Sequence, residues 1–157
     1  MSTSASHDQS AQSIAVASVR RHAMKADLWR HTVIGSLHPE LTSRCSFQPG
    51  ELPIASGYFS ESSWWVVSTQ RVISFFEGTL QELDPRHGID HNFGNFKGIK
   101  RSEAPGAPER EVATVRSPKT SDVVRFEFET GNASMAPIYA CMFWSRATGF
   151  HYGKNDV

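Results

Sequence analysis

The stretch SWWVVSTQRVISFFEGTLQELDP, from Ser63 to Pro85, determines most of what the sequence predicts about the fold. It contains two runs of β-branched and aromatic residues, SWWVVS and RVISFFE, which are joined by a very short polar break. Two strands this close together can only be connected as an antiparallel hairpin. The segment GTLQELDP follows as a further short strand, so this part of the chain predicts a β-meander.

Large side chains occur on both faces of the predicted hairpin. This pattern indicates either strands that are covered on both sides or a sheet with an exposed aromatic patch. The alternation places two sets of residues on opposite faces: Trp65, Val67, Ile73 and Phe75 against Trp64, Val66, Val72 and Phe76.

A helix is predicted over residues 13–35, after a disordered polar tail at residues 1–12. Small and apolar residues recur there at intervals of three and four, and Gly35 is a suitable helix end. A connector rich in proline follows, and the next short strand covers residues 54–60. The apolar residues in question are Ala15, Val19, Ala23, Ala26 and Val33.

The second half of the chain predicts two strands and a final helix. The strands cover residues 110–117 and 123–130, and the second alternates cleanly between apolar and charged residues. The helix covers residues 134–148, with Pro137 in its first turn, where proline is tolerated. Its apolar stripe is predicted to face the core, so Ile138→Ala or Phe143→Ala should cost roughly 2–5 kcal/mol. The stripe consists of Met135, Ile138, Tyr139, Met142 and Phe143.

A run of short antiparallel strands that ends in one amphipathic helix resembles the pleckstrin-homology superfold. The segment WWVVSTQRVISFF, followed by Leu80 and Leu83, is similar to bacterial PH-like and GRAM-like families. The resemblance covers residues 51–149. It implies an α+β, mainly β protein: a bent antiparallel sheet or barrel capped by the C-terminal helix. The helix at 13–35 is then an addition to that core, and residues 13–157 are expected to form a single domain.

Charge and hydropathy do not favour nucleic acid or a membrane as the partner. Lys and Arg together number 16, as do Asp and Glu, so the formal net charge is zero. There is no apolar run of bilayer-spanning length and no apolar leader segment, so a cytoplasmic location is expected.

Lipid binding is the main alternative function that the resemblance raises. Phosphoinositide-binding pleckstrin-homology domains gather Lys and Arg in the loop between their first two strands. The corresponding loop here, FSESSW, contains Glu61 and no basic residue. The candidate membrane contact is therefore the cluster of Lys97, Lys100 and Arg101.

No motif in the sequence indicates catalysis, a cofactor or a metal. His87 and His91 in HGIDH have a spacing seen in some zinc helices, but Gly88 disfavours a helix there. Cys141 lies in an apolar helical segment, where burial would raise the thiol pKa and suppress its reactivity. A small enzyme remains the second alternative, with the strand carboxylates Glu127 and Glu129 as the paired acidic groups.

Protein binding is the function that the sequence favours. Aromatic residues exceed what one small core readily absorbs, and exposed Trp and Tyr are common interface anchors. Because Trp64 and Trp65 point to opposite faces, one is expected to support the fold and the other a partner. The predicted partner-binding residues are Tyr58, Phe59, Trp64 and Arg71, with His91 and Phe93 at the rim.

Two further expectations concern the partner and the hairpin turn. By analogy of size and fold, the protein is expected to be a bacterial immunity protein that neutralises a toxin. At the turn, the Thr69 hydroxyl is expected to satisfy turn backbone groups. Arg71, although also a candidate contact, is expected to hydrogen-bond to loop carbonyls.

Overall fold

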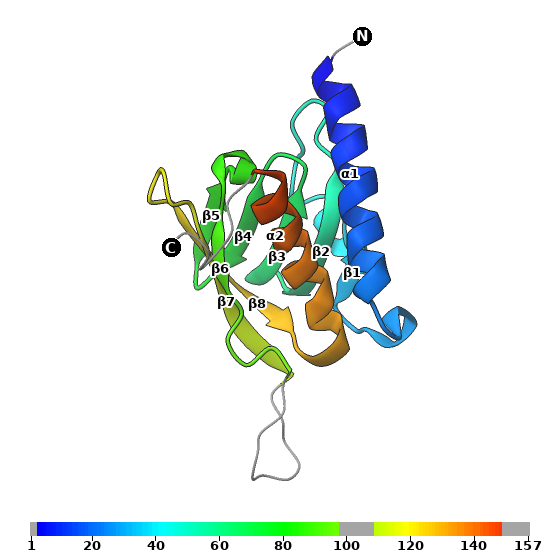
Figure 1. Ribbon diagram of the computed structural model, residues 1–157. Coiled ribbons are helices and arrows are strands. Elements are labelled where there is room, and N and C mark those ends of the chain that lie inside the picture. Colours follow the sequence, from blue (N-terminus) through cyan, green and yellow to red (C-terminus); the bar gives the residue numbers. More distant parts are fainter. Residues whose placement is uncertain (1–2, 98–108, 149–157) are drawn as a thin grey trace, which may run out of the picture.

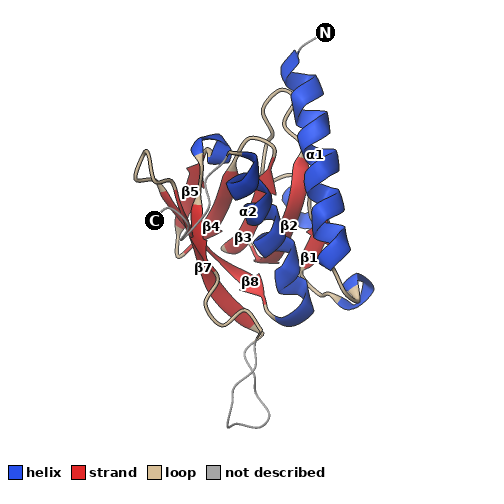
Figure 2. Cartoon of the chain, in the orientation of Figure 1, coloured by secondary structure: helices blue, strands red, loops and turns tan. Residues whose placement is uncertain are grey.

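Two antiparallel sheets form the body of the protein (Figure 1). The computed structural model describes residues 3–97 and 109–148. Within these ranges the fold is α+β and mainly β, as the sequence predicts (Figure 2). The first sheet has the order β1 (Thr32–Ile34), β2 (Pro53–Ser60), β3 (Ser63–Ser68), β4 (Val72–Phe76), β5 (Thr79–Leu83). The second has the order β6 (Asp90–Asn92), β7 (Arg110–Arg116), β8 (Val123–Glu129).

Two helices lie side by side against the first sheet (Figure 1). Helix α1 (Thr3–His22) packs against helix α2 (Met135–Ala147), and both contact β2. The rings of His22 and Tyr139 stack where the helices meet, with centroids 3.7 Å apart. Neither helix of the described ranges combines the length and hydropathy that a membrane-spanning segment requires.

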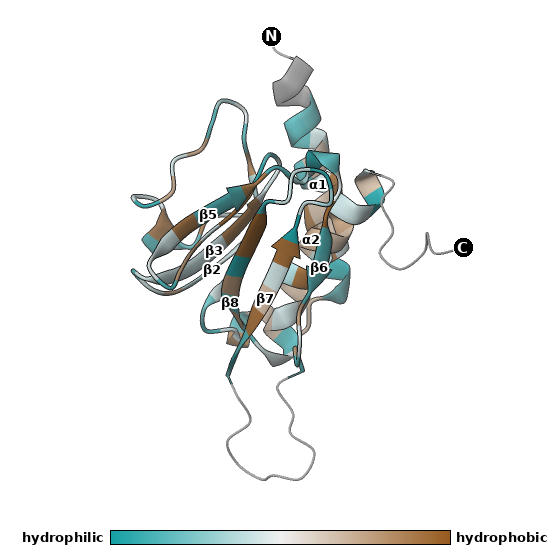
Figure 3. Cartoon of the chain, turned by 90° about the vertical axis from the view of Figure 1, so that its left-hand side faces the viewer, coloured by the Kyte–Doolittle hydropathy of each residue, from teal (hydrophilic) through white to brown (hydrophobic). Residues whose placement is uncertain are grey.

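The main core lies between the first sheet, strand β8 and the two helices. The alternation predicted for β8 is confirmed, because Val124, Phe126 and Phe128 are all fully buried. Figure 3 shows hydrophobic and hydrophilic positions alternating along this strand. Phe126 stacks on Trp65 of β3, with ring centroids 5.3 Å apart. The Trp65 ring also requires Gly57 on the neighbouring strand, since a Cβ at that position would lie 2.3 Å from the indole nitrogen.

A second, smaller core covers the outer face of the first sheet. Trp64, Val66 and Ile73 are buried there beneath Leu41 and Cys45 of the connector. The hairpin is therefore covered on both sides, which is the first of the two alternatives raised by its composition. The predicted faces of β4 are corrected: Phe75 pairs with Trp64 and Ile73 with Val66, so both lie on the outer face.

Polar side chains join the free edge of β8 to the first sheet. The Ser74 hydroxyl donates to the Arg125 carbonyl at 2.7 Å, and the Arg125 N–H donates to the Gln81 side chain at 2.8 Å. The Ser63 hydroxyl donates to Glu127 at 2.6 Å. These contacts give hydrogen-bond partners to backbone groups that an edge strand would otherwise leave unpaired.

The N-terminal helix differs from the prediction at both ends. It begins at Thr3 and ends at His22, whereas the sequence predicts a tail at residues 1–12 and a helix over 13–35. Lys25 has a left-handed backbone with φ 54°, which interrupts helical geometry. The β-branched residues that follow pair with β2 as strand β1. Apolar spacing alone did not distinguish this edge strand from a continuing helix.

The inward face of α2 also requires a correction. The helix bounds agree closely with the predicted 134–148, but small residues face the core instead of the predicted stripe. Ile138, Tyr139 and Phe143 are only partly buried. Small side chains let the helix axis approach the sheet and α1, and Trp144 fills the remaining space. The inward set is Ala136, Ala140, Cys141 and Trp144.

Candidate functional site

An apolar pocket of about 480 Å³ lies between the segment that begins with β6 and the first turns of α2. Polar groups enter its lining from His91 and Asn92 of strand β6. Concave, mainly apolar sites with a few polar groups are typical of ligand and side-chain binding. The remaining lining residues are Phe93, Gly94, Phe96, Met135, Ile138 and Tyr139.

The floor of the pocket is rigid because Phe93 belongs to the main core. Its side chain is 6% exposed and makes edge-to-face contacts with Phe126 and Phe128, at centroid distances of 6.2 and 5.2 Å. On its other side, Phe93 contacts the His91 ring at 5.5 Å. The pocket is thus built on packed aromatic rings and not on a loop alone.

Hydrogen bonds hold the rim of the pocket. The Asn92 side chain accepts from the Gly94 N–H at 2.8 Å, and Glu111 accepts from the Asn95 N–H at 2.9 Å. The Phe96 carbonyl accepts from the Gly131 N–H, also at 2.9 Å. Gly94 has φ +53°, and a Cβ there would lie 3.0 Å from the Glu111 carboxylate. Glycine is therefore favoured at this turn, and these hydrogen bonds hold the rim of the pocket in place.

His91 sets the electrostatic character of the pocket mouth. Burial lowers the pKa of its imidazole below the ordinary value of 6.5, and the nearby Asp90 charge opposes this shift only in part. The ring is consequently neutral at pH 7. A neutral imidazole offers one donor and one acceptor, which suits hydrogen bonding to an uncharged polar group.

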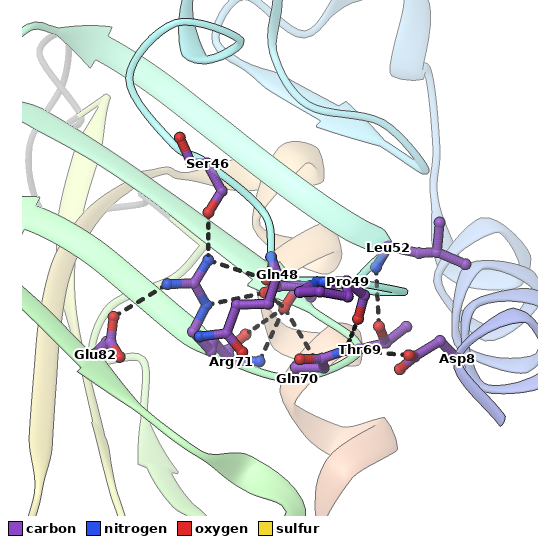
Figure 4. Close-up of polar contacts among 11 residues, drawn as sticks. Asp8, Ser46, Gln48, Pro49, Leu52, Thr69, Gln70, Arg71 and Glu82 are labelled. Atoms are coloured by element: carbon purple, nitrogen blue, oxygen red, sulfur yellow. Dashed lines mark hydrogen bonds and ion pairs between the residues drawn. The ribbon is translucent and has the colours of Figure 1, made fainter. Parts of the chain in front are cut away.

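Arg71, predicted as a partner contact, is instead the centre of a polar network (Figure 4). Its guanidinium binds Glu51 through two hydrogen bonds of 3.0 Å, and it also reaches Glu82 at 3.1 Å. It donates to the Ser46 carbonyl at 2.9 Å, which confirms the predicted bond to a loop carbonyl. Its side chain is only 12% exposed, so it has little surface to offer a partner.

The same network fixes the β3–β4 turn to the rest of the protein. The Thr69 hydroxyl accepts from the Leu52 N–H at 2.9 Å, which confirms its predicted structural role. Gln70 donates to Asp8 of α1 at 3.1 Å, and the Trp144 indole donates to the Ser68 carbonyl at 3.2 Å. Four segments that are distant in sequence therefore meet at this turn.

The other predicted contacts do not form one surface. Trp64 is 3% exposed and lies in the second core, so its expected accessibility is corrected. Tyr58 joins the outer cluster of that core, whereas Phe59 contacts His31 and lies under the Arg110 guanidinium, 4.1 Å from the cation. Of the six predicted residues, His91 and Phe93 come together in the pocket beside β6.

Sequence reasoning missed the α2 wall of the pocket. Met135, Ile138 and Tyr139 are expected in the core because they are apolar and have helical spacing. Their neighbours Ala136 and Ala140 carried the relevant signal, because a strip of small residues also marks a close-packed helix face. Lys97 is exposed, while Lys100 and Arg101 of the predicted basic cluster lie outside the described residues.

A second cavity, of about 540 Å³, lies between α1 and the end of α2, but its charged groups are already paired. Asp8 accepts from Gln70, and Arg86 binds both carboxylate oxygens of Asp84 at 2.8 and 2.9 Å. Because of these internal contacts, the charged groups of this cavity are less available to a ligand than the polar groups of the pocket beside β6.

Neither the histidines nor the cysteines assemble a reactive centre within the described residues. His87 lies in a short 3₁₀ turn and His91 in β6, so they do not share a helix face. No group of three His, Cys, Asp or Glu in those ranges is arranged to hold a metal ion. Cys141 is fully buried, as the sequence predicts, and burial raises its thiol pKa to about 12, which disfavours the reactive thiolate.

Comparison of this chain with protein-family models, with curated proteins and with solved structures finds no match.

Proposed function

We propose that the protein is a non-catalytic binding module that receives an apolar side chain of a protein partner. The pocket between β6 and α2 carries this proposal, since it is preformed, mainly apolar and open to a ligand of side-chain size. Met135 in its wall is a flexible, polarizable residue of the kind that adapts to partner side chains. The polar groups of His91 and Asn92 at its mouth would orient the partner.

The kinship with pleckstrin-homology domains is part of the same proposal. Two antiparallel sheets followed by a helix that covers the core support it. The lipid-binding alternative has less support: the pocket lining contains no Lys or Arg among the described residues, and Glu61 in the β2–β3 turn approaches Arg44 at 3.9 Å.

An affinity comparison between matched variants tests the proposed site. Ile138→Glu places a charge in the pocket wall, and Ile14→Glu places the same charge on α1, where the side chain is 62% exposed. A partner captured from host lysate with the parent protein should bind Ile138→Glu at least about thirtyfold more weakly, and Ile14→Glu as well as the parent. Equal calorimetric affinities for all three folded proteins would refute the site.

We further propose that this partner is a bacterial toxin that the protein binds in the cytoplasm. Two points support this proposal. One is the analogy of size and fold, and the other is a pocket whose proposed role is binding without catalysis. Co-expression with the captured partner tests this idea through growth. The parent protein and Ile14→Glu should restore growth, Ile138→Glu should not, and a partner without toxicity would exclude the immunity role.

A further inference from the structure

Strand β6 leaves one edge of the second sheet without a strand partner. The sheet order is β6-β7-β8, and β6 pairs with β7 through Asp90, His91 and Asn92. On its other side, no strand of the described ranges pairs with it. A strand edge of this kind presents backbone N–H and C=O groups in the pattern that another extended chain can match.

The free edge and the apolar pocket belong to the same groove. His91 and Asn92 of β6 line the pocket, and its opposite wall is Met135, Ile138 and Tyr139 of α2. Near the start of β6, the Ser145 hydroxyl of α2 approaches the Ile89 carbonyl at 3.4 Å. Helix α2 therefore runs alongside β6, close to it at the Ile89 end and separated from it by the pocket further along.

The two faces of β6 differ in polarity. The His91 ring contacts Phe93 on the side of the core. A smaller, polar cavity of about 280 Å³ adjoins the strand, and it is lined by His91 and by Asp90, Asn92, Thr114 and Arg116. Because successive side chains of a strand point to opposite faces, a strand added to β6 would meet apolar and polar surroundings in alternation.

We propose that an extended peptide of the partner adds to the outer edge of β6, with one large apolar side chain in the pocket. Its neighbouring side chains are polar and face the cavity that holds Asp90 and Arg116. The edge argues for a peptide, since a lipid or small apolar molecule would leave the backbone groups of β6 unmatched. This inference rests on the proposed function, because it uses the same pocket.

A library of short acetylated and amidated peptides provides the probe. Apolar residues (Phe, Leu, Ile) alternate with polar ones (Thr, Lys, Glu) in one half, and the other half has the same composition in non-alternating order. We expect saturable binders only in the alternating half. In the best binder, N-methylation should weaken binding about five- to tenfold at residues whose N–H faces β6, and little at the residues between them.

Protein variants separate the failure of this inference from that of the proposed function. The best peptide should lose about thirtyfold or more on Ile138→Glu and Met135→Glu, and nothing on Ile14→Glu, with thermal melts confirming that all three fold. If these losses occur but N-methylation has no alternating effect, strand addition is overturned and the pocket stands. If neither pocket variant weakens binding, the peptide does not use the pocket and strand addition there is overturned. If no peptide binds saturably, strand addition is likewise overturned, and the affinity of the captured partner for Ile138→Glu then decides the proposed function on its own.

Discussion

Arg71 illustrates how a residue's surroundings decide its role. In the sequence it is a basic residue in a hairpin turn, which is compatible with a partner contact. In the structure, its bidentate partner Glu51 is completely buried, and Glu51 also accepts from the Ser68 hydroxyl and from the Gln48 N–H at 2.9 Å. The pair therefore holds the connector against the sheet, in keeping with the structural role that the sequence predicts for Arg71 beside its candidacy as a partner contact.

The two carboxylates that bind Arg71 should differ greatly in their effect on stability. Glu51→Gln leaves the guanidinium without its buried counter-charge, so the free energy of unfolding should fall by roughly 3 kcal/mol. Glu82 is 52% exposed, and Glu82→Gln should cost less than about 1 kcal/mol because water screens that pair. Urea denaturation of both variants measures this difference. Equal losses would contradict the central role of the Glu51 pair.

The sequence indicates on which face of a strand a residue lies, but it does not indicate how exposed that residue is to solvent. Trp64 and Trp65 are adjacent aromatic residues in one strand, and local pattern correctly places them on opposite faces. Whether the outer one is accessible depends on Leu41 and the connector, whose packing is a long-range property. His91 and Phe93, predicted as the rim of a partner surface, line one pocket in the structure, although their role in binding stays a prediction.

Helix α2 shows that apolar spacing does not by itself identify the buried face of an element. Ala140 and Cys141 are fully buried, while the larger Ile138 and Tyr139 are left at the pocket. A larger residue at the alanine positions would hold α2 away from the cluster that Ala136 and Ala140 share with α1. The small residues of the inner face thus set how closely α2 packs.

The corrected face of α2 changes the expected cost of its substitutions. Trp144 is 6% exposed, so Trp144→Ala should lower the free energy of unfolding by about 3–5 kcal/mol. Ile138→Ala, at a partly buried position, should cost only about 1 kcal/mol, less than the sequence predicted. Chemical denaturation measures both losses of unfolding free energy, provided that the dependence of this free energy on denaturant concentration is the same in each variant. A larger loss for Ile138→Ala would restore the predicted stripe as the buried face.

Element positions were predictable wherever local pattern and packing agree. Strands β2, β3, β4, β5, β7 and β8 and helix α2 lie within one or two residues of their predicted bounds, since strong alternation, turn residues and Pro137 mark them. Strands β1 and β6 were not predictable in this way. Each has three residues, and such strands exist only because a neighbouring strand supplies their hydrogen bonds.

In the described part of the molecule, two hydrophobic clusters lie on the two faces of the first sheet. This arrangement takes up many of the aromatic side chains, and the exposed large hydrophobic residues of the described ranges include no aromatic one. It also places β6 and His91 at the margin of the main cluster, where burial is sufficient to affect titration.

The global stability of the protein should therefore depend on pH through His91. The unfolded chain takes up a proton as the pH falls through 6.5, whereas burial lowers the pKa of the folded imidazole. The unfolded state then binds more protons, so this contribution to stability is full above pH 6.5 and is lost as the pH falls towards the folded pKa. Denaturation at several pH values should show a flatter acid decline for His91→Gln than for the parent.

A companion variant checks the sign of this effect. The Asp90 charge raises the His91 pKa, so Asp90→Asn should lower it further and steepen the acid decline. His38, whose pKa is also lowered mainly by burial, should account for part of the decline that remains in His91→Gln. An unchanged profile in His91→Gln would show that the imidazole does not titrate differently on folding.

The contact between the two helices has a consequence for how the protein is made. Helix α1 leaves the ribosome long before α2, yet its buried residues Ala15 and Val19 belong to the same cluster as Ala136 and Ala140. Until α2 has been translated, the nascent sheet lacks one side of its main core. Folding of this core must then wait until α2 has been synthesised, and a chain stalled ahead of Met135 would expose to chaperones the surface that α2 later covers.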